Sequence, residues 1–592
     1  MESSTSFIVR VEAGPVGVSP SGYQDLSGRD FGGEAGALAV NDDWAETIYR
    51  YHPRYAPTVP SLPKPTGAAD EVIVSSRQEF LDVFDDATYT KVFIVKGTDL
   101  YNGQEQLSLT VSGSAGAPRW FIWYDPSDPG RVDDIRPWDL DVSEKVLMPH
   151  RIYAEGISHT WFVGLQWGIW APDPLQYGSA VLPYGTKFGA NGGRSQSAVW
   201  ARAGAHDLTF YRCYGEYTAN TSSGVFSMMY AMSDCGDRLT WYECFFAKPY
   251  EYEQESDWIL IQNGDDHRVV NCEFADVNNA AIQLGDQWGG KEFVIENCDF
   301  YKERRYDVDG NEQPGGPYVQ GDSLSGTKQT GNNSLPVNVR WYGNRFWGTR
   351  HACPGLDDNP YLACPIVHSG AQMSNPQCFR NDIRWNIIID CYSNNIRMFA
   401  QGVWDFGDAD TGNHTIARNI CAMSYPAAGD DTDYTWAINE DNVEVHLNTV
   451  AYTSQMTGVL STWHAAGLVT DNFDVMGNFF MDTGAFSMLI ENNPERCSDW
   501  RVGYNAFAGT YEVYSRTYPV GYEHGADKSS LNMGDFTFRR KQLSRPNDPE
   551  WLTTIPGIVP TSSTPAEFLN LVPQSGSDAI GSRSGIGSEA WP

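Results

Sequence analysis

The sequence predicts an all-β protein, a right-handed single-stranded parallel β-helix with an N-terminal capping helix and a C-terminal capping segment. First, a short phrase of alternating residues returns about ten times between His206 and Asn505. Second, its copies end 26 to 46 residues apart, a spacing typical of repeat proteins. Third, the phrases alternate with period two and are too short for an amphipathic helix. Together these observations favour stacked coils built from strands.

The last residue of each phrase is small and buried in this prediction. Cys stands there four times and then Asn six times: Cys213, Cys244, Cys272, Cys298, Asn344, Asn386, Asn419, Asn448, Asn478 and Asn505. We expect each Asn amide to bond along the turn and to stack on its neighbours in adjacent coils, because a buried amide needs partners. Cys would fill the same position as a small hydrophobic residue, and these cysteines are expected to be reduced.

The chain divides into four predicted parts. Residues 1–70, rich in Gly, Pro and Ser, form an arm and linker. Residues 71–170 hold a capping helix within 75–88, with Ser76 as its N-cap, and the first coils. Residues 171–530 form the main β-helix, with long insertions at about 301–338 and 350–380. Residues 531–592 would cap the last coil, because an uncovered coil exposes strand edges.

Charge and hydropathy exclude several classes. The chain of 592 residues carries 75 acidic against 41 basic side chains, a formal charge of -34, which disfavours nucleic acid as a partner. The sequence has no run of 18 apolar residues, so no transmembrane helix is expected. The N-terminus lacks the pattern of a signal peptide. The eleven cysteines do not suggest a disulfide framework, although a Cys353–Cys364 bridge inside one insertion is conceivable.

We expect a second set of strands between the phrases, at 257–266, 279–287, 317–323, 365–372, 397–408 and 434–442. Alternation predicts one outward column of polar residues on these strands, consisting of Gln262, Gln283, Gln320 and His368. A groove of amides suits a chain of sugar hydroxyls.

Gly precedes Asp at the end of three of these strands, which would present Asp265, Asp286 and Asp322 at the rim of the groove. Carboxylates on adjacent coils would lie about 5 Å apart, and on alternate coils about 10 Å apart. Those separations correspond to retaining and inverting glycosidase pairs. Gly-Asp is also ordinary turn chemistry, so a purely structural role is the competing interpretation.

The stretches SGSAGAPRWFIW and IYAEGISHTWFVGLQW, which follow the predicted helix, resemble the opening coils of pectate-lyase-like β-helix proteins. The resemblance covers residues 72–170 closely and the coils to 505 as a pattern. It implies a protein that binds and endo-cleaves an extracellular or capsular polysaccharide. With a leading arm and no export signal, the chain resembles phage tailspike depolymerases in particular. That implies a homotrimer attached to a phage tail through its N-terminal arm, located outside the cell or on the virion.

Hydrolysis by paired carboxylates is the favoured reaction, and two alternatives stay open. A polysaccharide lyase would need a base beside a uronate and a cation for its carboxyl group. The candidates for these roles are His368, Lys302, Arg305, Arg397 and Tyr318. A fibre or adhesin would bind the glycan without shortening it.

Substrate binding would further use aromatic stacking on sugar rings, with Trp288 and Trp404 as candidates. No cofactor is required. Calcium is an alternative for the acidic loop at 307–311, but its Gly does not fall where an EF-hand loop needs it, so a solvated loop is the default.

Overall fold

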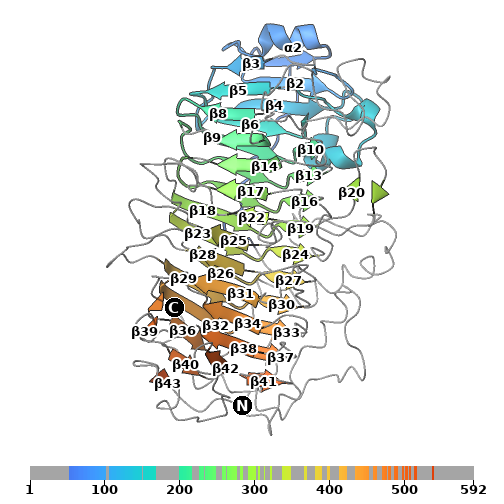
Figure 1. Ribbon diagram of the computed structural model, residues 1–592. Coiled ribbons are helices and arrows are strands. Elements are labelled where there is room, and N and C mark those ends of the chain that lie inside the picture. The colour runs from blue at the N-terminus through green and yellow to red at the C-terminus, as the bar shows by residue number, and fades with distance from the viewer. Residues whose placement is uncertain are drawn as a thin grey trace, which may run out of the picture.

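The computed structural model describes a limited set of residues in detail. These are 53–101, 106–149, 151–167, 199–216, 226–231, 234–247 and, from 256 on, the strands given below with residues 263–267, 271–272, 297–298, 343–344, 385–386, 418–419, 447–448 and 478. The described strands are almost all parallel and stack along one axis (Figure 1). The chain is a right-handed parallel β-helix, as the sequence predicts. No helix among the described residues is long and apolar enough to cross a membrane.

Sheet A contains the repeated phrases and has 15 described strands. They are β1 (Glu71–Val74), β2 (Lys91–Val95), β4 (Arg119–Tyr124), β6 (Ser158–Val163), β9 (His206–Tyr211), β12 (Thr240–Tyr242), β15 (Arg268–Val270), β18 (Lys291–Glu296), β23 (Val337–Tyr342), β26 (Asn381–Arg384), β29 (Gly412–Ala417), β32 (Asp441–His446), β36 (Phe473–Met476), β40 (Arg501–Gly503) and β43 (Thr537–Phe538).

Sheet B follows the last residue of each repeated phrase, which we name the ladder position, and has 11 described strands. They are β7 (Gln166–Trp167), β10 (Tyr214–Glu216), β13 (Phe245–Ala247), β16 (Glu273–Ala275), β19 (Asp299–Tyr301), β24 (Arg345–Trp347), β27 (Ile387–Ile389), β30 (Ile420–Ala422), β33 (Thr449–Ala451), β37 (Phe479–Met481) and β41 (Ala506–Ala508).

Sheet C contains the second set of strands and has 13 of them among the described residues. They are β3 (Gln106–Leu109), β5 (Arg151–Glu155), β8 (Val199–Arg202), β11 (Phe226–Ala231), β14 (Ser256–Ile261), β17 (Ala280–Leu284), β22 (Gln320–Asp322), β25 (Ile366–Ser369), β28 (Ile396–Phe399), β31 (Tyr434–Asn439), β34 (Gly458–Thr462), β38 (Phe486–Ile490) and β42 (Val513–Ser515). Each full coil therefore runs from sheet A to B to C.

Smaller elements complete the described structure. Two short pairs stand apart from the three sheets, antiparallel β20 (Arg305–Tyr306) with β21 (Glu312–Gln313) and parallel β35 (Thr470–Asp471) with β39 (Cys497–Ser498). Three 3-10 turns, η1 (Arg131–Asp134), η2 (Pro137–Asp139) and η3 (Val142–Glu144), follow β4.

The predicted N-terminal helix is present as α2 (Arg77–Val83), at one end of the stack (Figure 1). The Ser76 side chain accepts a hydrogen bond from the Glu79 amide, as expected of an N-cap. At the other end of the helix, Nη2 of the buried Arg119 donates to the Phe84 carbonyl at 2.9 Å. Phe80 and Phe84 pack against Phe121 of β4, so the helix buries its apolar face on sheet A.

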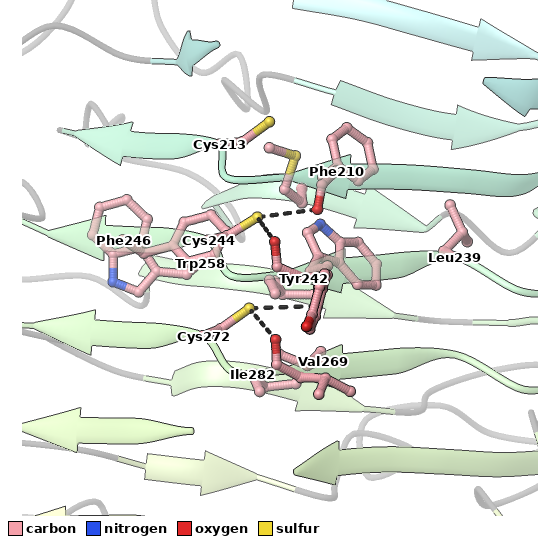
Figure 2. Close-up of a cluster of buried hydrophobic side chains, with 14 of the residues drawn as sticks. Phe210, Cys213, Leu239, Tyr242, Cys244, Phe246, Trp258, Val269, Cys272 and Ile282 are labelled. Atoms are coloured by element: carbon pink, nitrogen blue, oxygen red, sulfur yellow. Dashed lines mark hydrogen bonds between the residues drawn. The ribbon is translucent and has the colours of Figure 1, made fainter. Parts of the chain in front are cut away.

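The ladder between sheets A and B has the expected form, with one addition. Asn344 Nδ2 donates to the Ile295 carbonyl of the preceding coil at 2.9 Å, and its Oδ1 accepts from the Cys298 amide at 2.9 Å. The same bonds recur through Asn386, Asn419, Asn448 and Asn478. The cysteine thiols occupy the equivalent place, and Cys244 Sγ donates to the Phe210 carbonyl at 3.2 Å (Figure 2). These cysteines are free, and each is both a small apolar residue and a weak donor.

A left-handed residue precedes the ladder position in each described coil from Arg212 to Leu447, with φ between 50° and 64°. Such a φ is strained for residues other than Gly. Its amide N–H compensates by bonding to the next coil, as from Arg212 to the Tyr242 carbonyl at 3.0 Å. The repeated sharp turn keeps sheets A and B in register.

Aromatic stacks fill the interior between the sheets. Phe246, Phe274, Phe300 and Phe346 stack in sheet B with ring centroids 4.6 to 5.1 Å apart. Trp258 of β14 is buried, and its ring centroid lies 5.7 Å from that of Phe246. Each such pair adds about 1 kcal/mol beyond its area burial, so the stacks stabilise successive coils.

The described part of the predicted arm, residues 53–70, lies along the outer side of sheet A. The amides of Arg54 and Tyr55 donate to the fully buried Glu296 carboxylate at 2.7 and 2.8 Å. The Tyr55 ring lies 6.3 Å from Tyr342, and the Arg54 guanidinium lies 4.9 Å from the Trp385 ring. The chain's own N-terminal segment therefore occupies this outer face.

Candidate functional site on the outer face of sheet C

One register position can be followed through all 13 strands of sheet C. It runs from Ser108 through Tyr153, Trp200, Tyr230, Leu260, Gln283, Asp322, Val367, Arg397, Ala437, Ser461 and Leu489 to Tyr514. We name this set the sheet C column.

The neighbours of the column point into the core. Ile152, Val199, Met229, Ile259 and Ile282 are all buried, and each lies one residue before or after a column position. Because side chains alternate along a strand, Tyr153 and Trp200 of the column belong to the outer face. Tyr153 and Trp200 are accordingly only partly buried.

Tyr153 and Trp200 form the best-described part of this face, on adjacent strands β5 and β8. Their rings meet edge to face, with centroids 5.4 Å apart. The Arg202 guanidinium lies 4.0 Å from the Tyr153 ring, and the Arg151 guanidinium lies 4.3 Å from the Trp200 ring. A cation and the aromatic face beside it attract each other, so these contacts hold both rings in place.

Polar bonds fix the same cluster from its edges. The Tyr153 hydroxyl donates to Gln106 Oε1 at 2.9 Å and accepts from Arg151 Nη1 at 3.1 Å. Arg202 forms a short ion pair with Glu155, which also accepts from the Ser108 hydroxyl. A rigid aromatic surface with polar edges is suited to a sugar ring, whose C–H face stacks while its hydroxyls bond.

The structure brings together three of the predicted site residues and separates others. Gln283, Asp322 and Arg397 share the sheet C column. Gln320 pairs with Ala280 and so lies outside the column. The register shifts between Ala280 and Ile282, and this shift brings Asp322 opposite Gln283. His368 pairs with Met398, which pairs with the buried Ile438. The strand pairing thus gives a different column from the expected row of glutamines ending in His368.

The predicted aspartates do not occupy equivalent places. Asp322 lies within β22, whereas Asp265 lies in the turn between β14 and β15. Arg305 lies in β20, outside the three sheets. Asp286, Gln262, Trp288 and Trp404 lie outside the described residues, as do the acidic loop at 307–311 and Cys353 with Cys364.

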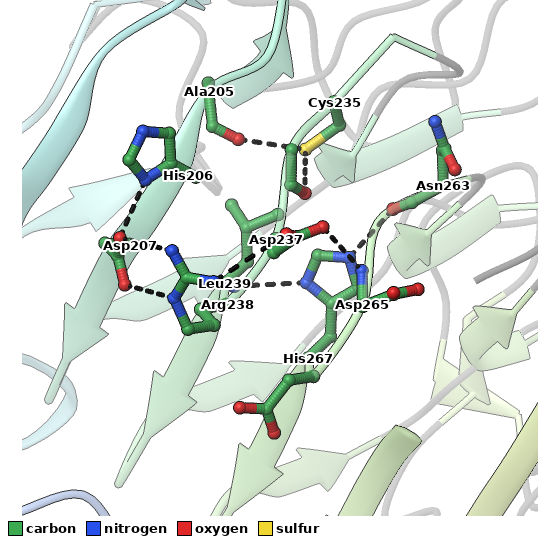
Figure 3. A network of polar contacts seen from close by, with 12 residues as sticks. Ala205, His206, Asp207, Cys235, Asp237, Arg238, Leu239, Asn263, Asp265 and His267 are labelled. Carbon is green, nitrogen blue, oxygen red and sulfur yellow. Dashed lines mark hydrogen bonds and ion pairs between the residues drawn. The ribbon is translucent and has the colours of Figure 1, made fainter. Parts of the chain in front are cut away.

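The turn that holds Asp265 contains a network of internal contacts (Figure 3). The Asp265 amide donates to Asp237 Oδ1 at 3.0 Å, and its carbonyl accepts from the Arg238 amide at 2.8 Å. Arg238 in turn holds Asp207 through Nε and Nη2 at 2.7 and 2.9 Å. Burial raises the pKa of Asp207, but hydrogen bonds from Arg238 and His206 outweigh it and lower the pKa to about 2. Asp207 is therefore ionised at neutral pH and is a poor general acid.

His267 occupies the same turn as a buried neutral imidazole. Its Nδ1 accepts from the Leu239 amide at 3.1 Å, so its Nε2–H donates to the Asn263 carbonyl at 2.8 Å. Burial lowers the pKa of His267 to about 4. Gly264 is required beside it, because a Cβ there would lie 2.5 Å from His267 Nε2. These contacts fix the shape of the turn on which Asp265 lies.

The sequence interpretation missed Arg151, Tyr153 and Trp200. Their signal was present, since RIYAE and VWAR both alternate outward and inward residues. The first stretch appears in the sequence as part of the opening coils. The second follows a long interval without the repeated phrase, so no pattern joins it to the first.

No protein-family model matches the chain, and no curated protein matches it. Among solved structures, the catalytic unit of a GH87 alpha-1,3-glucanase from Streptomyces thermodiastaticus is 11% identical, with a TM-score of 0.36, and the match covers 70% of this chain. This chain spans 64% of the length of that unit.

Two further structures are similar at the same level. A tailspike protein mutant of the Escherichia coli bacteriophage HK620, solved with a pentasaccharide, is 13% identical over 72% of this chain and 71% of that chain, with a TM-score of 0.37. A mannuronic acid specific polysaccharide family 6 lyase from human gut microbiota is 12% identical over 80% of this chain and 91% of that chain, with a TM-score of 0.34. At these identities no residue of this chain takes a role from them.

Proposed function

We propose that the chain binds an extracellular or capsular polysaccharide along the outer face of sheet C and cleaves it internally by hydrolysis. The observation that carries the proposal is the sheet C column, which aligns the aromatic pair Tyr153 and Trp200 with Gln283 and Asp322. A linear array of aromatic, amide and carboxylate residues would match the repeating faces and hydroxyls of a sugar chain.

The occupation of sheet A supports the choice of face. The amides of Arg54 and Tyr55 bind Glu296 on that side, and Val59 and Leu62 pack toward the core. A polysaccharide would have to displace this segment to reach sheet A, whereas it could lie on Tyr153 and Trp200 directly.

Asp322 is the first candidate for the cleaving carboxylates, because it alone among the predicted aspartates lies in the described column. Asp286 and Asp265 are the candidates for its partner. One carboxyl group would protonate the glycosidic oxygen and the other would activate water or attack directly. A spacing of one coil, about 5 Å, would favour a retaining reaction and two coils an inverting one.

One observation favours lyase chemistry as the second candidate. Arg397 shares the column with Asp322 and is separated from it only by Val367. A guanidinium at that position could neutralise a uronate carboxylate while a base removes the neighbouring proton. The location outside the cell or on a virion, the homotrimer and attachment through residues 1–70 follow from the sequence resemblance and stay predictions.

The test incubates the full chain with a panel of bacterial capsular and algal polysaccharides. Reducing ends without ultraviolet absorbance would support hydrolysis, and absorbance of an unsaturated uronate would instead support the lyase. Asp322→Asn should lower product formation by about a thousandfold. Asp266→Asn is the matched control, because Asp266 lies in the turn and pairs with Arg268 at 2.9 Å. Glycan binding without any shortening would contradict cleavage and indicate a fibre or adhesin.

A further inference from the structure

We propose that Arg151, with Tyr153 and Trp200, forms a subsite for a sugar that carries a carboxylate. This inference rests on the proposed function and adds a substrate class, an acidic polysaccharide. It also places the recognition of charge at the first coils, away from Asp322.

The guanidinium of Arg151 is buried and incompletely bonded. The residue is 3% exposed, and Nη1 donates to the Tyr153 hydroxyl at 3.1 Å. Nε and Nη2 are both buried without a hydrogen-bond partner. Within the described part of the chain, no carboxylate forms an ion pair with Arg151.

Such a group is unfavourable unless something binds it. A buried charge without a partner destabilises a protein, and polar atoms in interiors are nearly always bonded. The contact with the Trp200 ring at 4.3 Å offsets part of this, but it supplies no acceptor to Nε or Nη2. An anion with two oxygens would supply an acceptor to both nitrogens.

Two other arginines of the chain show what the Nε and Nη2 edge of a guanidinium binds. In Arg238 the pair Nε and Nη2 holds the Asp207 carboxylate at 2.7 and 2.9 Å, and in Arg345 it holds Asp299 at 2.5 and 2.6 Å. The side-on fork is thus filled by a carboxylate in both residues. Arg151 presents the same fork without one.

The carboxylate on the same strand as Arg151 is already engaged. Glu155, four residues along β5 from Arg151, pairs with Arg202 and accepts from Ser108. The ligand must therefore bring its own carboxylate. Its ring would lie on the partly exposed Tyr153 and Trp200, so the site fits a uronate or another carboxylated pyranose.

The subsite and the candidate cleavage position belong to the same sheet C column. Trp200 and Asp322 are four strand steps apart in the sheet C column, which corresponds to roughly 19 Å at the usual strand spacing. A polysaccharide bound at Arg151 would extend along the column to Asp322. Arg151 would then select acidic chains without taking part in the reaction.

The test uses alginate, polygalacturonate and hyaluronan, each before and after carbodiimide and borohydride reduction of its carboxyl groups. Affinity electrophoresis of the full chain measures binding. We expect at least one acidic glycan to bind about tenfold to a hundredfold more tightly than its reduced form. Arg151→Gln should remove this difference and leave affinity for the reduced form unchanged.

Two variants guard the interpretation. Arg238→Gln removes a guanidinium whose fork is already filled, and it should preserve the preference. Arg151→Lys keeps the charge and loses the fork, so it should lose most of the preference even if Arg151→Gln fails to fold. Equal binding of acidic and reduced glycans by the wild type would overturn this inference and leave the proposed function standing. Binding of no acidic, reduced or neutral capsular glycan would overturn both.

Discussion

The outer faces of sheets A and C differ in where their polar groups find partners. On sheet A, the Glu296 carboxylate is satisfied by the amides of Arg54 and Tyr55 from the chain's own N-terminal segment. On sheet C, Arg151 is buried with two unpartnered nitrogens beside partly exposed rings. A face that completes its own bonds stabilises the fold, and a face that leaves bonds open is prepared for a ligand.

This comparison predicts a separation of effects. Substitutions on sheet A and its turns should lower stability and spare glycan chemistry. Substitutions on the outer face of sheet C should impair glycan binding or cleavage and leave stability unchanged.

The largest expected effect is that of Asp322→Asn on sheet C. General acid and base groups contribute about 100-fold to 10,000-fold in rate, so polysaccharide cleavage should fall by about a thousandfold. The midpoint of thermal unfolding should not change. Reducing ends and circular dichroism measure the two quantities, and cleavage by Asp322→Asn at the rate of Asp266→Asn would remove Asp322 from the mechanism.

The opposite result is expected for Glu296→Ala on sheet A. Two backbone N–H groups would lose a charged acceptor, which should lower the free energy of unfolding by about 3 kcal/mol. Activity below the unfolding transition should stay at the wild-type level. Urea denaturation measures the change against Glu444→Ala, which removes an exposed carboxylate of the same sheet. A loss of glycan binding equal to that of a sheet C variant would break the separation of faces.

The turn at His267 should make stability depend on pH. Its folded-state pKa of about 4 lies below the unfolded value of about 6.5, so protonation favours the unfolded chain. Stability should be fully present above pH 6.5 and fall as the pH drops toward 4, with a loss of about 2 kcal/mol between pH 7 and pH 5. Urea midpoints at the two pH values measure this loss. His267→Gln should show a smaller pH dependence, and an equal dependence in both proteins would contradict the assignment.

The smallest expected effect is that of Trp200→Ala. The loss of one stacking ring should weaken glycan affinity by about tenfold, equivalent to about 1.4 kcal/mol. Trp258→Ala is the contrasting variant, because that ring is buried against Phe246 and its loss should lower stability instead. Similar losses of stability in both variants would argue against a binding role for Trp200.

The sequence predicts the coils because their cause is local and repeated. Alternation marks the strands of sheet A, and the need of a buried Asn for partners predicts the ladder from Asn344 to Asn478. The thiol donation of Cys244 is not predictable from its apolar character alone, although its position in the ladder is.

The site is less predictable because it depends on register. A shift between Ala280 and Ile282 places Gln320 opposite Ala280 and Asp322 opposite Gln283. A one-residue slip exchanges the faces of a strand, and no spacing in the sequence reports it. The contact of Arg151 with Trp200 joins residues 49 positions apart across a coil boundary, so it appears only in the folded chain.

The most direct test of the account is amide hydrogen exchange of the full chain, with and without the polysaccharide of the panel that it binds. We expect slower exchange in β5, β8 and β17 of sheet C and unchanged exchange in β18 and β23 of sheet A. Protection confined to sheet A would contradict the assignment of the binding face.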